Sequence, residues 1–555
     1  MNIVHFISKK TVITITVFFM FSFESLAQIY ESTNNSVYPF LYRMAQKGVI
    51  DFNDVVLPLD RKEIYNYLYS IKSDTTDKRK LLTTVENTEL GFYLQDFYYD
   101  NDDNSFSSKK GYQFLKLDKT KGRFRTFIAQ HKNVKLFVDP VFGMQATKYG
   151  NGNSTSYFNG LRTYGYLGKN IGFNFFFRDI TDVGDSLDIT RQYNSQQGFV
   201  NTSNKSNQLN FSNINFNLGY VFKNGSLSIG KDNLNWGYGQ AGKIVLSSKA
   251  PSYLFVRLKY QPFKWLDFNY FHGSLQSDLV DSANSYTTGV GVAGGYREVY
   301  RKKFIANHSI TIKPLKGLDI AIGESMVYSD QFDIGYLIPI NFFKAYDQYL
   351  SKYALNGGSN GQFFGQISSR NHLKKTHLFV TLFIDEINLS NILDKQKSRN
   401  QVGYTLGANR TDLLLPNLSL GVEFTKVRGG VYNNVIPAQT YYNSSFALGD
   451  WMGQNAERLF IYSAYSPIPR MRVDFSYQFI RKGDDITIEQ QYSLPSPGFI
   501  EKQLYSSKEI SASLSYEFLN TLKAFGAYKK SVFSYPSIID SRSRNSITIG
   551  FTYGM

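Results

Sequence analysis

The sequence contains no cysteine and little proline. Because none of its 555 residues is cysteine, disulfides, a lipoprotein anchor, a thiolate nucleophile and cysteine metal sites are all excluded. The 14 prolines and 43 glycines exclude a collagen-like repeat, and a hydrophobic content of 42% excludes a disordered chain. No Pro- or Ser-rich linker divides the chain after about residue 130, which favours one large unit over several domains.

Long apolar runs are also scarce. One lies near the N-terminus, where Lys9 and Lys10 precede the apolar residues 11–21 and Ser25-Leu26-Ala27 forms a small-x-small cleavage site. This pattern predicts a cleaved secretory signal peptide over residues 1–27. No later stretch offers about 18 to 20 consecutive apolar residues, so no transmembrane helix is expected after cleavage.

Residues 28–110 are predicted to form a small N-terminal helical region. Helices are expected over residues 38–47, 60–72 and 84–98. Asp60 and Glu63 have the spacing of a capping box at the start of the second helix. The apolar residues on one face of that helix are Ile64, Leu68 and Ile71. This face needs a covering surface, so we expect the region to pack on the main body of the protein.

From residue 111 onward the apolar pattern changes to a period of two, which is typical of β-strands. About eighteen strands are predicted, over residues 134–147, 157–168, 170–179, 210–222, 226–230, 241–248, 253–260, 264–272, 303–313, 317–328, 376–385, 402–409, 417–427, 457–465, 470–480, 508–518, 521–530 and 545–553. Tight turns alternate with long polar connections, at about 180–209, 275–302, 329–375, 428–456 and 481–507. This rhythm is typical of outer-membrane barrels, whose periplasmic turns are short and whose outer loops are long.

Basic residues alternate with apolar ones in these strands. Arg257 and Lys259 share one face of a predicted strand, and so do Arg470 and Arg472 in another. Because Arg or Lys facing lipid at the membrane midplane costs about 2 to 4 kcal/mol, these four residues are predicted to face the lumen. The 41 Tyr and 46 Phe could supply aromatic girdles. A soluble sandwich or propeller would show the same alternation of residues.

The fold prediction is therefore an all-β transmembrane barrel of about eighteen antiparallel strands over residues 111–555, preceded by the helical region 28–110. The predicted location is the outer membrane of a Gram-negative bacterium. Outer-membrane lipids and the barrel-assembly machinery are the partners that this location implies.

The net charge of +16 indicates an anionic partner or environment. An acidic surface polysaccharide, anionic lipid headgroups and charge pairing inside the lumen all agree with it. Arg297, Arg301, Lys302 and Lys303 cluster at the end of one long connection and are predicted to contact an anionic ligand. Secretion and the lack of a recognition motif argue against nucleic acid.

One stretch, Ser226–Tyr260, carries a family resemblance. Its segments Gly230-Lys231-Asp232, Trp236-Gly237-Tyr238-Gly239 and Leu246-Ser247-Ser248-Lys249-Ala250 resemble the signature of the capsule-assembly Wzi family of outer-membrane proteins. Further segments are similar to the branch of this family in Bacteroidetes-type bacteria, namely 38–41 with 58–61, 323–325 with 339–343, and 448–449 with 453–456. The resemblance implies an eighteen-stranded barrel with a helical part at its periplasmic side. It also implies a role in retaining capsular polysaccharide by lectin-like binding.

Trp236 and Tyr238 admit two interpretations. Their rings could stack on sugar rings, with the neighbouring glycines allowing close approach of the backbone. Alternatively, the segment is a structural element inside the barrel wall, kinked at its glycines. The close spacing and the flanking strands favour the structural interpretation.

The predicted function is non-enzymatic: an outer-membrane barrel that binds capsular or other acidic surface polysaccharide and takes part in capsule assembly or attachment. The alternative is an outer-membrane channel or porin, selective for anions. The least favoured hypothesis is a barrel hydrolase that depends on His272, His308 or His377. The histidines lie outside any HExxH pattern, and neither a metal nor a cofactor is predicted.

Overall fold

The computed structural model describes residues 28–100, 111–118, 123–131, 133–150, 152–185, 187–200, 203–205, 207–288, 295–353, 358–387, 400–493, 495, 497–536 and 541–555. The predicted signal peptide therefore lies outside the described residues. None of the helices in these ranges has the length and apolar character needed to cross a bilayer.

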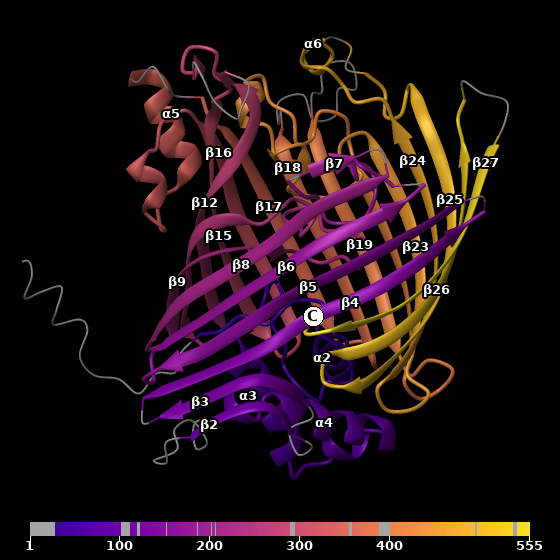
Figure 1. Cartoon of the computed structure of the whole chain (residues 1–555). Helices are drawn as coiled ribbons and strands as arrows, with labels where there is room; N and C mark the ends of the chain where they lie inside the picture. The colour runs from indigo at the N-terminus through magenta and orange to yellow at the C-terminus, as the bar shows by residue number, and fades with distance from the viewer. Residues whose placement is uncertain are drawn as a thin grey trace, which may run out of the picture.

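Eighteen strands of the described residues close into one antiparallel barrel (Figure 1). They are β4 (Val134–Tyr149), β5 (Gly152–Leu167), β6 (Ile171–Gly184), β8 (Gln208–Phe222), β9 (Gly225–Asp232), β11 (Tyr253–Phe263), β12 (Leu266–Val280), β15 (Tyr300–Leu315), β16 (Leu318–Ser329), β17 (Asn360–Arg370), β18 (Thr376–Glu386), β19 (Gln401–Thr411), β20 (Leu418–Val427), β23 (Ala456–Tyr465), β24 (Met471–Gly483), β25 (Gln503–Leu519), β26 (Leu522–Ser534) and β27 (Ser541–Tyr553). The barrel closes where β27 pairs with residues 142–149 of β4. The predicted fold class is confirmed.

Shorter strands accompany the barrel. They are β1 (Val56–Leu57), β2 (Gly111–Asp118), β3 (Arg123–His131), β7 (Ser203–Lys205), β10 (Asn235–Trp236), β13 (Tyr286–Thr287), β14 (Tyr296–Arg297), β21 (Tyr442–Asn443) and β22 (Phe446–Ala447). The hairpin of β2 and β3 extends the sheet, because β3 pairs with residues 134–138 of β4, next to the segment that β27 occupies. Two strands thus share one edge of β4.

All but one of the predicted strands correspond to barrel strands. The exception is 241–248, which lies inside the barrel and forms only an isolated bridge, between Leu246 and Trp236. Conversely, the sequence pattern did not predict β17, which lies within the predicted connection 329–375. Its outward positions include two glycines, Gly361 and Gly365, so its apolar alternation is weak. The two errors cancel in the strand count.

The N-terminal helices lie at the end of the barrel where short turns join the strands (Figure 1). They are α2 (Val37–Gln46), α3 (Arg61–Ser73) and α4 (Thr84–Asp96), with short 3-10 turns η1 (Arg79–Leu81) and η2 (Tyr98–Asp100). The predicted apolar face of α3 is buried, as expected. The helices at the opposite end are α5 (Phe343–Tyr353) and α6 (Ile488–Gln491), with 3-10 turns η3 (Ile334–Leu337) and η5 (Pro437–Gln439).

The start of α3 differs from the prediction. Asp60 is its N-cap and accepts a hydrogen bond from the Lys62 backbone N–H at 2.7 Å. Glu63 does not complete a capping box, because its carboxylate pairs with Lys259 of the barrel wall at 2.7 Å. Burial raises the pKa of Asp60 to about 7. Glu63 therefore forms an ion pair with Lys259 of the barrel wall instead of a hydrogen bond to the backbone at the start of its own helix.

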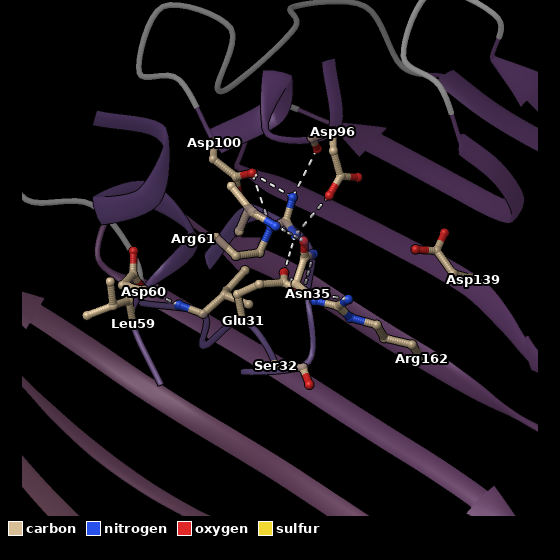
Figure 2. A network of polar contacts seen from close by, with 12 residues as sticks. Glu31, Ser32, Asn35, Leu59, Asp60, Arg61, Asp96, Asp100, Asp139 and Arg162 are labelled. Carbon is tan, nitrogen blue, oxygen red and sulfur yellow. Dashed lines mark hydrogen bonds and ion pairs between the residues drawn. The ribbon is translucent and has the colours of Figure 1, made fainter. Parts of the chain in front are cut away.

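A buried ion-pair network joins the N-terminal region to the wall (Figure 2). Arg61 of α3 is fully buried and pairs with Glu31 and, at 2.9 Å, with Asp100. Glu31 also pairs with Arg162 of β5 at 2.7 Å. Burial alone would raise the pKa of Glu31, but the two guanidinium groups hold it well below its ordinary value. The carboxylate stays charged at neutral pH, and its stabilising effect is lost only as the solution is acidified below its ordinary pKa.

The same network continues into the closing strands. Arg123 of β3 pairs with Asp96 of α4 at 2.7 Å and with Asp139 of β4 at 2.8 Å. The N-terminal region is therefore tied by ion pairs to β3 and β5, the two neighbours of β4 on either side of it at this end, and the end with short turns is covered.

The lumen is filled by two connections that fold inward. The first inward connection is residues 233–252, and the second is residues 428–455. Their apolar side chains form one buried cluster with lumen-facing wall residues, including Phe271 and Phe383. Hydrogen bonds hold the two together, such as that from the Tyr432 hydroxyl to the Ile244 carbonyl at 2.7 Å. This part of the lumen is a packed core.

We expect Arg61→Met to weaken the protein markedly. Removing one partner of a buried ion pair costs about 3 to 5 kcal/mol, because the remaining charges stay buried without compensation. Thermal unfolding in detergent, followed by heat-modifiable gel migration, measures the effect.

The matched control is Lys80→Ala. Lys80 pairs with Asp77 at 2.7 Å, but both side chains are more than four-fifths exposed, so no measurable change is expected. Equal shifts in the two variants would contradict a stabilising role for the network.

Candidate functional site

A polar cavity of about 530 Å³ lies inside the barrel, between the wall and the first inward connection. We call it the lumen cavity. Residues of β5, β6 and β8 form its wall, residues 32–34 line one side, and residues 239–243 line another. Its size falls within the range of about 300 to 1,000 Å³ that is usual for small-ligand sites.

The wall of the lumen cavity carries amide, aromatic and cationic side chains at alternating positions. Asn174, Phe176 and Arg178 of β6 line it together with Asn213 and Asn215 of β8. The register places Phe176 opposite Asn215 and Arg178 opposite Asn213. Side-chain amides both donate and accept hydrogen bonds, as a polyhydroxylated ligand requires.

Two polar atoms of this wall are buried without a hydrogen-bond partner, Oδ1 of Asn174 and Nε of Arg178. The Arg178 guanidinium donates to the Met555 sulfur at 3.0 Å and lies over the Phe158 ring. No ion pair neutralises it within the described ranges of the chain. A buried polar group usually has a partner, so this wall is suited to receive one from a ligand.

The first inward connection supplies cations on the other side of the cavity. Burial lowers the pKa of Lys243, whose ammonium donates to the Gly237 carbonyl. Trp451, from the second inward connection, lines the cavity and donates its indole N–H to the Ala241 carbonyl at 2.7 Å.

Lys249 holds the connection between β6 and β8 in place over the lumen cavity. Its ammonium donates to three backbone carbonyls, those of Arg191, Asn194 (2.9 Å) and Gln196 (2.7 Å). Burial lowers its pKa to about 8, so it remains mostly charged at neutral pH. Gln197 of the same connection lines the cavity. Lys249, the fourth residue of the Leu-Ser-x-x-Ala segment, thus orders one side of the site.

Trp236 and Tyr238 lie in the lumen core, so their placement in the wall was wrong. Trp236 belongs to β10, which pairs with β1, and its indole donates to Ser309 of β15 at 3.1 Å. Tyr238 packs against Phe379 of β18. Both side chains are buried, with no free ring face for a sugar. Alternation could not reveal this, because an apolar side chain is covered equally well by lipid or by a lumen core.

The glycine beside Tyr238 explains part of this motif. Gly239 has φ of +143°, and a Cβ there would lie 2.0 Å from the Gly242 carbonyl oxygen. Only glycine fits this close approach of two backbone segments.

The four basic residues predicted to contact an anion do not form one cluster. Arg297 is exposed on β14, and Lys302 is exposed at the start of β15. Arg301 is paired with Asp330 at 2.6 Å. Lys303 is buried, with its ammonium 3.4 Å from the Thr440 hydroxyl. The structure therefore leaves two of them at the surface.

Three of the four residues predicted to face the lumen point inward. Arg257 is buried and donates to the Pro58 carbonyl, Lys259 meets α3, and Arg472 lines a second internal cavity. Arg470 lies in the turn before β24 rather than in the strand, and it donates to the Phe518 carbonyl at 3.1 Å. Its predicted position in the strand was wrong by one residue.

The three histidines considered for catalysis are separate. His377 has Nε2 at 2.8 Å from the Ser368 hydroxyl inside the lumen, whereas His272 and His308 lie on the outer face of the wall. Across the described residues, none of the three is hydrogen-bonded to a carboxylate, and no group of metal-ligating side chains has the required geometry.

Sequence reasoning missed the wall of the lumen cavity. The available signal was the run Asn213, Asn215 and Asn217, which places an amide at every second position of a correctly predicted strand. Its partner strand carries Asn174 and Arg178 on the facing side. Only the register brings the two together.

We expect Trp236→Ala to lower the stability of the protein by about 3 to 5 kcal/mol, because it leaves a cavity in the lumen core. Thermal unfolding measures this loss. Trp265→Ala is the control, since that side chain is 51% exposed at a short turn, and we expect a much smaller effect. Unchanged stability with lost polysaccharide binding would instead support the sugar-stacking interpretation.

The family model for the capsule assembly protein Wzi matches residues 181–532. Among solved structures, this chain is similar to Wzi from Escherichia coli, described as an outer-membrane protein involved in group 1 capsule assembly and a carbohydrate-binding β-barrel. The identity is 12% and the TM-score 0.55, over 95% of this chain and 99% of that one.

Other barrels are more distant. OccD3 (OpdP) from Pseudomonas aeruginosa is 11% identical with a TM-score of 0.40, over 75% of this chain and 90% of that one. OccAB4 from Acinetobacter baumannii is 10% identical with a TM-score of 0.40, over 76% and 98%. A comparison with curated protein sequences finds no match.

The similarity to a Bacteroidetes-type branch stays a prediction. Because the family model covers more than half of the sequence and the fold agrees with it, this chain belongs to the Wzi capsule assembly family of outer-membrane β-barrels.

Proposed function

We propose that this barrel takes part in capsule assembly by binding an acidic surface polysaccharide in a lectin-like, non-enzymatic way. Membership of the Wzi family supports the role in capsule assembly. The observation that carries the proposed binding is Arg178, a guanidinium without an ion-pair partner in the described residues, set among amides in the lumen cavity.

The chemistry of the lumen cavity fits an acidic saccharide. Asn174, Asn213 and Asn215 offer donors and acceptors to sugar hydroxyls. The Phe176 ring offers an apolar face, and the Arg178 fork matches a carboxylate. The E. coli Wzi structure is described as a carbohydrate-binding barrel, which is the ligand class proposed here.

The exposed cations Arg297 and Lys302 are proposed as first contacts for the polymer. Both lie at the end of the barrel with the long connections, which faces outward in outer-membrane barrels. In this arrangement the signal peptide 1–27 is removed on export, the region 28–110 lies in the periplasm, and the barrel-assembly machinery inserts residues 111–555. The positive net charge favours the approach of an anionic polymer.

We expect Arg178→Gln to reduce the affinity for acidic polysaccharide about tenfold, because a hydrogen bond to a charged group contributes about 1.5 to 3 kcal/mol. Calorimetry with the native capsule and with a neutral glycan measures it. Binding of the neutral glycan should change little.

The control is Arg410→Gln, an exposed arginine at the end with short turns. Its affinity should match the unmodified protein. If Arg178→Gln bound the acidic polymer normally, the lumen cavity would not be the site.

We also expect purified protein in planar bilayers to show no porin-like conductance, since the two inward connections fill the lumen. Steady, anion-selective current would support the channel alternative.

Polysaccharide incubated with the protein should keep its chain length, as judged by size-exclusion chromatography. Shortening that is lost in His377→Ala would favour the hydrolase hypothesis.

A further inference from the structure

The outer face of the barrel carries an unusual set of polar residues on three neighbouring strands. Tyr270 and His272 of β12, His308 of β15, and Glu324 and Tyr328 of β16 all face away from the lumen. Their neighbours in each strand, such as Phe271 and Val327, face the lumen core. Ionisable side chains facing acyl chains are costly and need a cover.

A segment between β16 and β17 covers these residues. It comprises residues 330–353, includes η3 and α5, and is called the strap here. Figure 1 shows α5 outside the barrel, beside β12 and β16. The strap therefore does not extend away from the membrane as a free outer loop.

The strap supplies hydrogen-bond partners to three of the five outward residues, while His272 and Tyr328 bond to each other at 2.7 Å. The Tyr270 hydroxyl donates to the Tyr336 carbonyl at 3.0 Å. His308 Nδ1 lies 2.9 Å from the Pro339 carbonyl and must donate to it, because a carbonyl only accepts. The Glu324 carboxylate accepts the Lys344 backbone N–H at 2.8 Å.

Glu324 thus caps the first turn of α5 from a different element of the fold. A carboxylate at a helix N-terminus satisfies free backbone N–H groups and opposes the helix dipole. The His308 ring stacks on Phe343, with centroids 4.4 Å apart. These contacts join the segments 323–325 and 339–343, which the family resemblance singled out as a pair.

The outer surface of the strap is apolar. Ile340 is 85% exposed, and Ile334, Ile338 and Phe342 are at least half exposed. This surface is continuous with the lipid-facing wall, because the Phe342 ring lies 6.2 Å from that of Phe363, an outward residue of β17. The outward face of α5 is mixed, with Gln348 and Lys352 beside Tyr349, which is 61% exposed.

The position of Glu324 along β16 places this surface at membrane depth. A strand needs about 9 to 11 residues to cross the hydrocarbon layer. Glu324 is the seventh residue of β16, counted from Leu318 beside the short turn. It therefore lies within the span, and the strap on top of it faces the outer half of the bilayer.

We propose that the strap lies in the outer leaflet, with Ile338, Ile340 and Phe342 among lipid acyl chains and the outer side of α5 at the headgroups. The partner of this surface is lipid, since it continues the wall that already contacts lipid. This inference is independent of the proposed polysaccharide binding.

The absence of cysteine allows a direct test. Ile340→Cys is labelled with a nitroxide in the full-length protein, which is reconstituted in phosphatidylethanolamine–phosphatidylglycerol vesicles. Collisions with oxygen report lipid, and collisions with a water-soluble nickel chelate report water. Ile322→Cys, a lipid-facing wall position, and Gln348→Cys, on the outward face of α5, are the controls.

The expected result is an oxygen-to-nickel ratio at Ile340 equal to that at Ile322 and several-fold above that at Gln348. Ile338→Cys should repeat it if the first variant assembles poorly. A ratio at Ile340 equal to that at Gln348 would overturn the proposal. Protection from both reagents in isolated outer membranes would also overturn it, because a protein partner would then cover the strap.

Discussion

The need to pair every backbone polar group within a membrane governs this structure. Strands satisfy it only when the sheet has no open edge in the hydrocarbon layer, and here β27 closes on β4. Once the sheet is closed, alternate side chains of every strand face either lipid or an enclosed lumen. The lumen then has to be filled or hydrated, and the identity of what fills it separates this barrel from an open channel.

Two kinds of packing fill the lumen. The inward connections bring Trp236, Tyr432 and their neighbours into a dry cluster against the wall. The N-terminal helices cover the end with short turns through paired charges, with Arg61 at the centre. A further buried ion pair inside the barrel joins Arg458 to Asp450 at 2.8 Å. Arg178 has no ion-pair partner among the described residues and lines the cavity of about 530 Å³, and the proposed polysaccharide binding rests on this position.

The same constraint acts on the outside of the wall. Glu324 and His308 lie on the outer side of the wall, where charge is disfavoured, and the strap covers them and supplies their hydrogen-bond partners. On both the lumen face and the lipid face of the barrel wall, the residues are therefore covered by a connection that folds back on the wall. The inward connections cover polar and apolar residues of the lumen face, and the strap covers polar residues of the lipid face.

The sequence by itself determined the barrel, most of its strands and the apolar face of α3, because a period of two or of 3.6 residues records that one side of an element is covered. It could not say what covers that side. Residues 241–248 alternate like a wall strand yet lie in the lumen, whereas β17 lacks the pattern and lies in the wall. The candidate site was harder to predict from the sequence. The alternating asparagines of β8 could be seen there, but their position opposite Arg178 depends on strand register. Likewise, only the tertiary structure decided that Arg301 and Lys303 are engaged while Arg178 is free of an ion pair in the described residues, because charge pairing depends on distances between residues far apart in the chain.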